Sequence, residues 1–134
     1  MQVDPLGTET VLLVEDQRDV MRLARLALER HGYTVLTAQS GASAVELSDS
    51  YAGTMHLLVS DVVMPDIGGR YVADVLRRSR PEIKILLMSG YTNDAVVRHG
   101  VSNQVHDFLQ KPFTPSMLAR KVRAVLDATN KERE

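Results

Sequence analysis

The sequence predicts an α/β fold, a (βα)5 arrangement in which a doubly wound parallel sheet of five strands alternates with helices. Short apolar runs alternate along the chain with stretches whose apolar residues recur every three to four positions. Several runs are nearly continuous, which is typical of strands buried on both faces of a parallel sheet. Because crossovers between parallel strands are right-handed, helices are expected on both faces of the sheet.

The expected strands follow one another at regular intervals. They cover residues 11–14, 33–36, 57–59, 83–88 and 105–109. The first, third and fourth runs are nearly continuous, so we expect these strands to be buried on both faces.

The helices are predicted from apolar stripes between these runs. The stripe of the first helix consists of Val20, Leu23, Ala24, Ala27 and Leu28. Gly32 follows as a C-terminal stop. The stripe of the second consists of Ala42, Val45 and Leu47, and that of the third of Tyr71, Val72, Val75 and Leu76.

Two more helices complete the predicted pattern. A short fourth helix is expected over residues 92–99, before Gly100. The last begins with Thr114 as N-cap and Pro115 at its first position, a favoured combination. Its stripe consists of Leu118, Val122, Val125 and Leu126, and we interpret its basic residues Arg120, Lys121 and Arg123 as a solvated face.

Composition limits the classes of function. The 134 residues suit one domain, and a formal net charge of −1 favours no direct binding of nucleic acid or of an anionic membrane. The chain has no cysteine, which excludes disulfides and thiol catalysis and suits the reducing cytoplasm, where we expect the protein. No apolar run approaches the ~20 residues that span a bilayer.

The two ends differ from the rest of the chain. Residues 1–8 carry Pro5 and Gly7 without periodicity, and we interpret them as a linker or an expression remnant. Residues 129–134 are a polar tail. The predicted domain therefore covers residues 9–128.

Polar side chains stand directly after four of the five predicted strands. Glu15 and Asp16 follow the first, Asp61 the third, Ser89 the fourth and Lys111 the fifth. Ligands of open parallel sheets bind at the carboxyl ends of the strands. Three carboxylates, a hydroxyl and an ammonium group are thus expected to share one rim.

This set of groups predicts metal-assisted phosphoryl transfer. Converging carboxylates repel one another, and a divalent cation with oxygen ligands relieves the repulsion. A carboxylate beside such an ion can attack a phosphoryl group and form an aspartyl phosphate. Lys111 and Ser89 can then neutralise and hydrogen-bond the phosphoryl oxygens.

Four motifs at these strand ends carry a family resemblance. They are VLLVEDQ (11–17), SDVVMPDIGG (60–69), MSGYT (88–92) and FLQKPF (108–113). In order and spacing they resemble a bacterial response-regulator receiver domain, which implies a flavodoxin-like receiver fold. The sequences of the last two motifs are similar to those of receivers at the C-terminus of hybrid sensor histidine kinases.

The resemblance implies a role for each matching residue. Asp61 is the phosphoacceptor, and Glu15, Asp16, Asp61 and the backbone carbonyl of Val63 hold Mg²⁺, or Mn²⁺ in its place. Lys111 and Ser89 bind the phosphoryl group, and the Lys111–Pro112 bond is often cis in the family. Ser89 and Phe108 form the switch, with Phe108 at a position where tyrosine is common.

The resemblance also implies partners. The phosphodonor it implies is a histidine kinase or a histidine phosphotransfer domain. From the sequence pattern, Met21 lies off the core stripe of the first helix and one turn from the acidic pair, so we assign it to a docking patch for this donor. Output is expected from the fourth helix, fifth strand and fifth helix, a face that also allows a homodimer. By itself the domain is a switch rather than an enzyme, and the bulky Val63 and Tyr91 predict a long-lived phosphoform.

Three alternatives stay open. The chain could be a stand-alone single-domain regulator. It could be an aspartyl-phosphate hydrolase of the haloacid dehalogenase group, although Val63 stands where that chemistry wants a second carboxylate. It could be a flavodoxin-like cofactor binder, but residues 15–19 (EDQRD) would repel a phosphate without a metal.

Overall fold

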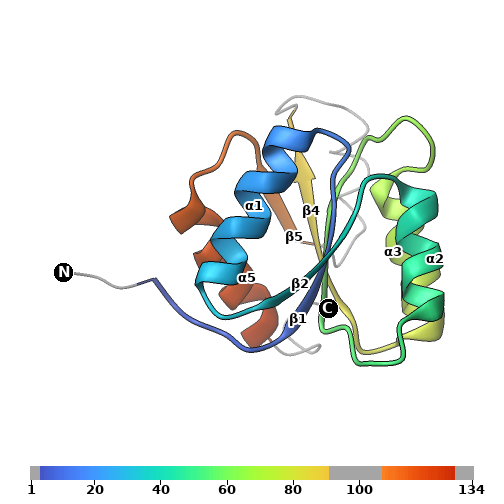
Figure 1. Cartoon of the computed structure of the whole chain (residues 1–134), viewed down its shortest axis with the longest axis horizontal. Helices are drawn as coiled ribbons and strands as arrows, with labels where there is room; N and C mark the ends of the chain where they lie inside the picture. Colours follow the sequence, from blue (N-terminus) through green and yellow to red (C-terminus); the bar gives the residue numbers. More distant parts are fainter. Residues whose placement is uncertain (1–3, 91–106, 129–134) are drawn as a thin grey trace.

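A five-stranded parallel sheet forms the centre of the protein, seen here in a computed structural model that describes residues 4–90 and 107–128. The strands lie in the order β2-β1-β3-β4-β5 (Figure 1). Their bounds are β1 Thr10–Val14, β2 Thr34–Ala38, β3 Leu57–Asp61, β4 Lys84–Ser89 and β5 Asp107–Gln110. All four pairings are parallel, as the sequence predicts.

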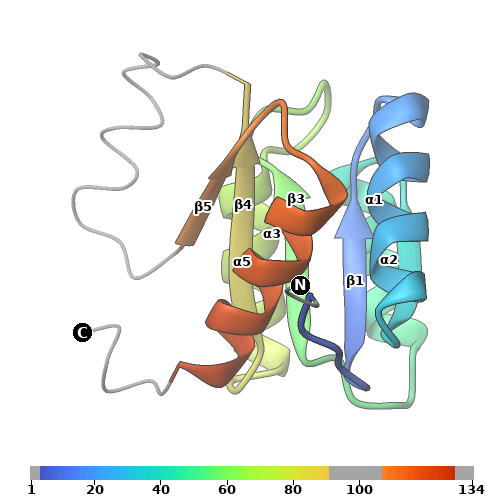
Figure 2. The same ribbon diagram turned by 90° about the vertical axis from the view of Figure 1, so that its left-hand side faces the viewer.

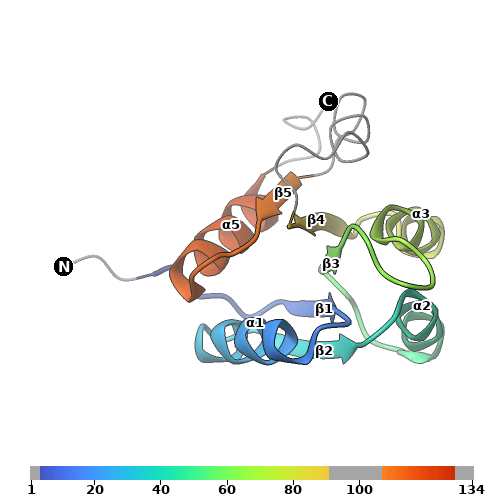
Figure 3. The ribbon, with the colours of Figure 1, turned by 90° about the horizontal axis from the view of Figure 1, so that it is seen from above.

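Helices cover both faces of this sheet (Figure 3). α1 (Arg18–Arg30) and α5 (Pro115–Asp127) pack together on one face, and α2 (Gly41–Ser50) and α3 (Gly69–Ser79) on the other. Figure 2 shows α5 lying in front of the sheet, with β5 at the edge of the sheet. The doubly wound α/β prediction is confirmed, while the helix expected over residues 92–99 falls outside the described residues.

Successive side chains of the central strands pack alternately into two separate hydrophobic cores, one on each face of the sheet. In β1, Val11 and Leu13 face α1 and α5, whereas Leu12 and Val14 face α2 and α3. All four side chains are fully buried, which stabilises the fold by roughly 1.5–3 kcal/mol for each large side chain. This is why the central strands have no polar face.

Three predicted helix stripes were partly wrong. In α2, Ala42 was expected in the core but is exposed, and Ala44 is buried instead. In α1, Met21 is buried in the core although we expected it off the stripe, and Leu23, expected in the core, is 42% exposed. In α3, Tyr71 is 55% exposed, and the small Ala73 is buried in its place. These helices carry apolar residues on more than one face. Close packing against the neighbouring helix determines which face is buried.

Residues 4–8, the described part of the expected linker, make contacts with the domain. Asp4 accepts a hydrogen bond from Ser116 (2.7 Å), and the amide of Gly7 donates to the carbonyl of His31 (2.9 Å). A Cβ atom on Gly7 would lie 2.2 Å from the ring of Tyr33, so a larger residue here would require that ring to move. The segment therefore belongs to the α1–α5 side of the molecule.

The start of α5 is as predicted. Thr114 accepts a hydrogen bond from the amide of Met117 (3.1 Å), and Pro115 occupies the first helical turn. Among the described residues, no helix combines the length and apolar character needed to cross a bilayer.

Candidate functional site

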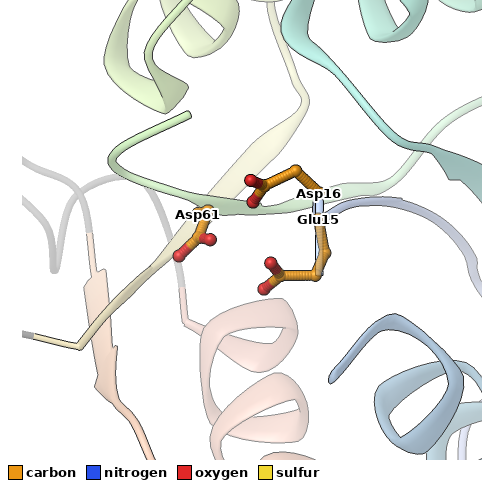
Figure 4. A group of neighbouring side chains, drawn as sticks. All are labelled: Glu15, Asp16 and Asp61. Atoms are coloured by element: carbon orange, nitrogen blue, oxygen red, sulfur yellow. The ribbon is translucent and has the colours of Figure 1, made fainter. Parts of the chain in front are cut away.

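Three carboxylates meet at the carboxyl end of the sheet (Figure 4). Glu15 and Asp16 directly follow β1, and Asp61 is the last residue of β3. One oxygen of each lies within 4.8 Å of the others. The convergence expected from the sequence is thus present in the structure.

Strand pairing brings these residues together. β1 and β3 are neighbours with Val14 opposite Ser60, so the next positions, Glu15 and Asp61, lie side by side. Glu15 is fully buried, whereas Asp16, the next residue beyond the end of β1, is exposed. The group therefore has one deeply placed carboxylate and one that reaches solvent.

Lys111 completes the group from the other side. Its Nζ lies 2.7 Å from Oε1 of Glu15 and 3.0 Å from both carboxylate oxygens of Asp61. Its amide donates to the carbonyl of Ser89 (2.8 Å), which holds the end of β5 against β4. The Lys111–Pro112 peptide bond is cis, as the resemblance implies.

Burial and charge shape the ionisation of this group. Burial raises the pKa of Glu15, and the Asp61 carboxylate adds to the rise against the hydrogen bonds from Lys111 and the amide of Gln17. Burial lowers the pKa of Lys111, but its bonds to Glu15 and Asp61 outweigh this and raise it overall. Lys111 therefore stays charged and balances only part of the negative charge.

A cavity of about 280 Å³ opens beside the carboxylates. It is lined by Asp16, Gln17, Asp61, Val62, Val63, Met88, Ser89, Gly90 and Lys111. A water molecule takes about 30 Å³ of liquid volume, so the cavity has room for a hydrated ion and a phosphoryl group. It brings Ser89, Val63 and Lys111 around Asp61, as the sequence predicts.

Two other predicted site residues, Phe108 and Met21, do not line this cavity. Phe108 is half-buried in β5 and packs against the core on the α3 side. Met21 is 8% exposed, which leaves little of its side chain for a partner to contact. Tyr91 lies outside the described residues.

Sequence reasoning missed the structural reason for Gly69. A Cβ atom there would lie 2.1 Å from the carbonyl oxygen of Asp61, so only glycine lets α3 begin so close to the site. The adjacent glycines Gly68 and Gly69 are the sequence signal that could have indicated this close approach.

Comparison with known proteins identifies the class. Residues 11–123 match the family described as the response regulator receiver domain, and the chain belongs to this family. It is a receiver domain, a phosphoacceptor signalling module of two-component systems.

The chain is similar to parts of a sensor kinase and of a response regulator. The chain is 41% identical over 125 residues to the sensor kinase CckA of Brucella abortus, covering 92% of this chain and 13% of that protein. It is 24% identical over 121 residues to the response regulator SaeR of Staphylococcus aureus, covering 90% of this chain and 52% of that protein. The chain thus spans about half or less of these relatives.

Solved structures show the same fold. The receiver domain of the hybrid histidine kinase CckA matches with a TM-score of 0.74 and 32% identity, covering 88% of this chain and 99% of that one. The chemotaxis protein CheY4 of Vibrio cholerae matches with a TM-score of 0.78 and 25% identity, covering 89% and 99%. The flavodoxin-like receiver fold is therefore confirmed.

Proposed function

We propose that this receiver domain accepts a phosphoryl group from a phosphohistidine onto Asp61. An oxygen of Asp61 bonds to phosphorus, the phosphorus–nitrogen bond breaks, and the histidine ring nitrogen keeps the electron pair. The observation that supports this best is the convergence of Glu15, Asp16 and Asp61 around a cavity that Lys111 also lines.

The donor set fits a divalent cation. Three carboxylates face one ammonium group, so the site has an excess of negative charge with oxygen ligands close together. We propose that Glu15, Asp16, Asp61 and the carbonyl of Val63 would hold Mg²⁺, or Mn²⁺ in its place. When bound, such an ion supplies positive charge that stabilises the oxygens of the transferring group.

The protein's own groups then position and stabilise the phosphoryl group. Lys111, already beside both oxygens of Asp61, would shift part of its contact onto the new phosphoryl oxygens. The hydroxyl of Ser89 lines the same cavity and would donate to another. We propose that this pull on Ser89 favours a second packing of Phe108 and alters the surface around β5 and α5.

The donor is proposed to be a histidine kinase or a histidine phosphotransfer domain that docks beside α1. A second hollow of about 320 Å³ lies along this helix, with Arg18, Arg22 and Leu26 among its lining residues. The similarity to CckA supports a module of a hybrid kinase working in the cytoplasm. A homodimer through α5 and β5 stays a prediction.

Phosphorylation of the intact protein tests this proposal. We expect acetyl phosphate with Mg²⁺ to add one phosphate to the wild type and none to Asp61→Asn, as read by intact mass. Asp49→Asn, on the exposed side of α2, is the matched control and should behave as the wild type. An equal phosphate on Asp61→Asn would refute the proposal, and turnover of many phosphate esters would indicate the hydrolase.

The loss of the added phosphate over time measures the lifetime of the phosphorylated protein. Val63 is 56% exposed at the cavity and has no carboxylate or amide to orient an attacking water. We therefore propose a long-lived phosphoform once acetyl phosphate is removed. A half-life of a few seconds would contradict this.

A further inference from the structure

We propose that Asp66 is a positioning residue that clamps the loop carrying Val63 onto the start of α2, and so sets the backbone carbonyl that the metal needs. The inference rests on the proposed function, because Val63 matters only if its carbonyl is a ligand. Asp66 lies in the β3–α3 loop and is not one of the three carboxylates that form the metal cluster.

Both oxygens of Asp66 hold the backbone of another element. Oδ1 accepts from the amide of Gly41 (3.2 Å) and Oδ2 from the amide of Ala42 (2.9 Å), the first two residues of α2. These positions have no hydrogen-bond acceptor within their own helix. The hydrogen bond from Ala42, with others from nearby amides, lowers the pKa of Asp66.

α2 has a cap of its own, so capping alone does not account for Asp66. The Ser40 side chain accepts from the amide of Ser43 (3.1 Å). What Asp66 adds is a link across 24–25 residues of sequence between the helix and the loop. A second contact reinforces this link, since a Cβ atom on Gly41 would lie only 2.7 Å from the carbonyl oxygen of Ile67.

Val63 has no side-chain anchor of its own. Its side chain is 56% exposed, so its carbonyl must be positioned by the residues before and after it. On one side Val62 donates its amide to the carbonyl of Met88 (2.9 Å) and is buried. On the other side Met64 is buried, and Asp66 then ties the loop to α2. Releasing Asp66 removes one of the two anchors on the C-terminal side of Val63, and leaves only Met64 there.

A Mg²⁺ titration followed by NMR amide shifts tests the clamp without relying on phosphorylation. We expect Asp66→Ala to weaken Mg²⁺ binding by roughly three- to tenfold, and Asp66→Asn, which keeps one acceptor oxygen, to recover part of the loss. Ser40→Ala is the matched control: it removes the other cap of the same helix and should bind Mg²⁺ as the wild type does. The spectra also report whether each variant is folded.

The outcomes separate the clamp from the proposed function. If Asp66→Ala and Asp66→Asn bind Mg²⁺ within twofold of the wild type, the clamp is refuted while the proposed site stands. If Ser40→Ala weakens binding as much as Asp66→Ala, Asp66 acts only through helix stability and the clamp is also refuted. A wild type that binds no Mg²⁺ refutes the proposed metal site, and the clamp with it. If Asp66→Ala does not fold, the Asp66→Asn titration decides.

Discussion

Glu9 and Glu15 are both glutamates, but their surroundings shift their pKa values in opposite directions. Glu15 is fully buried, and burial raises its pKa. Glu9 pairs with Arg123 through both oxygens, at 3.1 Å and 2.7 Å, and the hydrogen bonds from Arg123 lower its pKa to about 2. Arg123, interpreted as part of a solvated face, is therefore a structural residue that ties the start of β1 to α5.

The pair of Glu9 and Arg123 predicts a pH dependence of stability. Because the folded-state pKa of Glu9 lies below its ordinary 4.5, the ionised form favours folding. Its contribution is complete above about pH 4.5 and is lost as pH falls toward 2. We expect Glu9→Gln to destabilise the protein by about 1–2 kcal/mol at pH 7, after allowance for solvent screening, and by less at pH 3.

Urea unfolding of both proteins at the two pH values measures this difference. Glu82→Gln, at an exposed position, is the control and should change stability equally little at both. A Glu9→Gln effect that is the same at pH 7 and pH 3 would contradict the assigned pairing.

Arg80 joins two helices at the end of α3. Its guanidinium donates to the hydroxyl and carbonyl of Ser48 (both 2.9 Å), and to the carbonyls of Tyr51 (2.8 Å) and Gly53 (2.9 Å). The last carbonyls of α2 have no partner within the helix, and Arg80 satisfies part of this need from another element. The planar fork of arginine suits several acceptors at once.

Removing this fork should loosen the α2–α3 layer. We expect Arg80→Ala to lower the free energy of unfolding by about 2–4 kcal/mol, since several partly buried acceptors lose their donor. Arg80→Lys should recover little, because one ammonium group cannot reach acceptors in so many directions. Urea unfolding is the measurement, with the exposed Arg78→Ala expected within about 0.5 kcal/mol of the wild type. A full recovery by lysine would contradict this assignment.

At the scale of the whole molecule, the sheet concentrates acidic groups at one end. Strands far apart in the sequence end beside one another, so Glu15, Asp16 and Asp61 repel in the folded state more than in the unfolded chain. Lys111 offsets part of this repulsion. A bound divalent cation should therefore stabilise the fold as well as support the chemistry.

Thermal unfolding with and without Mg²⁺ tests this coupling. At a Mg²⁺ concentration ten times the dissociation constant, we expect stabilisation by about 1.4 kcal/mol relative to EDTA. Asp16→Asn should lose most of this gain, because it removes one ligand and one charge. Sodium chloride at matched ionic strength controls for screening, and an equal gain from sodium chloride would contradict a specific site.

The sequence predicted the residues that converge at the site more accurately than it predicted the buried faces of the helices. Glu15, Asp61 and Lys111 were found because each directly follows an apolar run and parallel strands end at one edge. Asp66 was missed because its partners, Gly41 and Ala42, lie in another helix and no local pattern marks them. The ion pair between Arg123 and Glu9 was missed because the two residues lie far apart in the sequence.

By itself, the sequence determined the alternation of strands and helices, the motifs at the strand ends and the family to which they belong. Those features depend on local periodicity and on the chemistry of single side chains, which the order of residues states directly. Only the tertiary structure decided that Met21 rather than Leu23 is buried. It also decided that residues 4–8 pack on the domain and that Asp66 joins a loop to α2. Each of these outcomes depends on close packing between elements that the chain brings together only when folded.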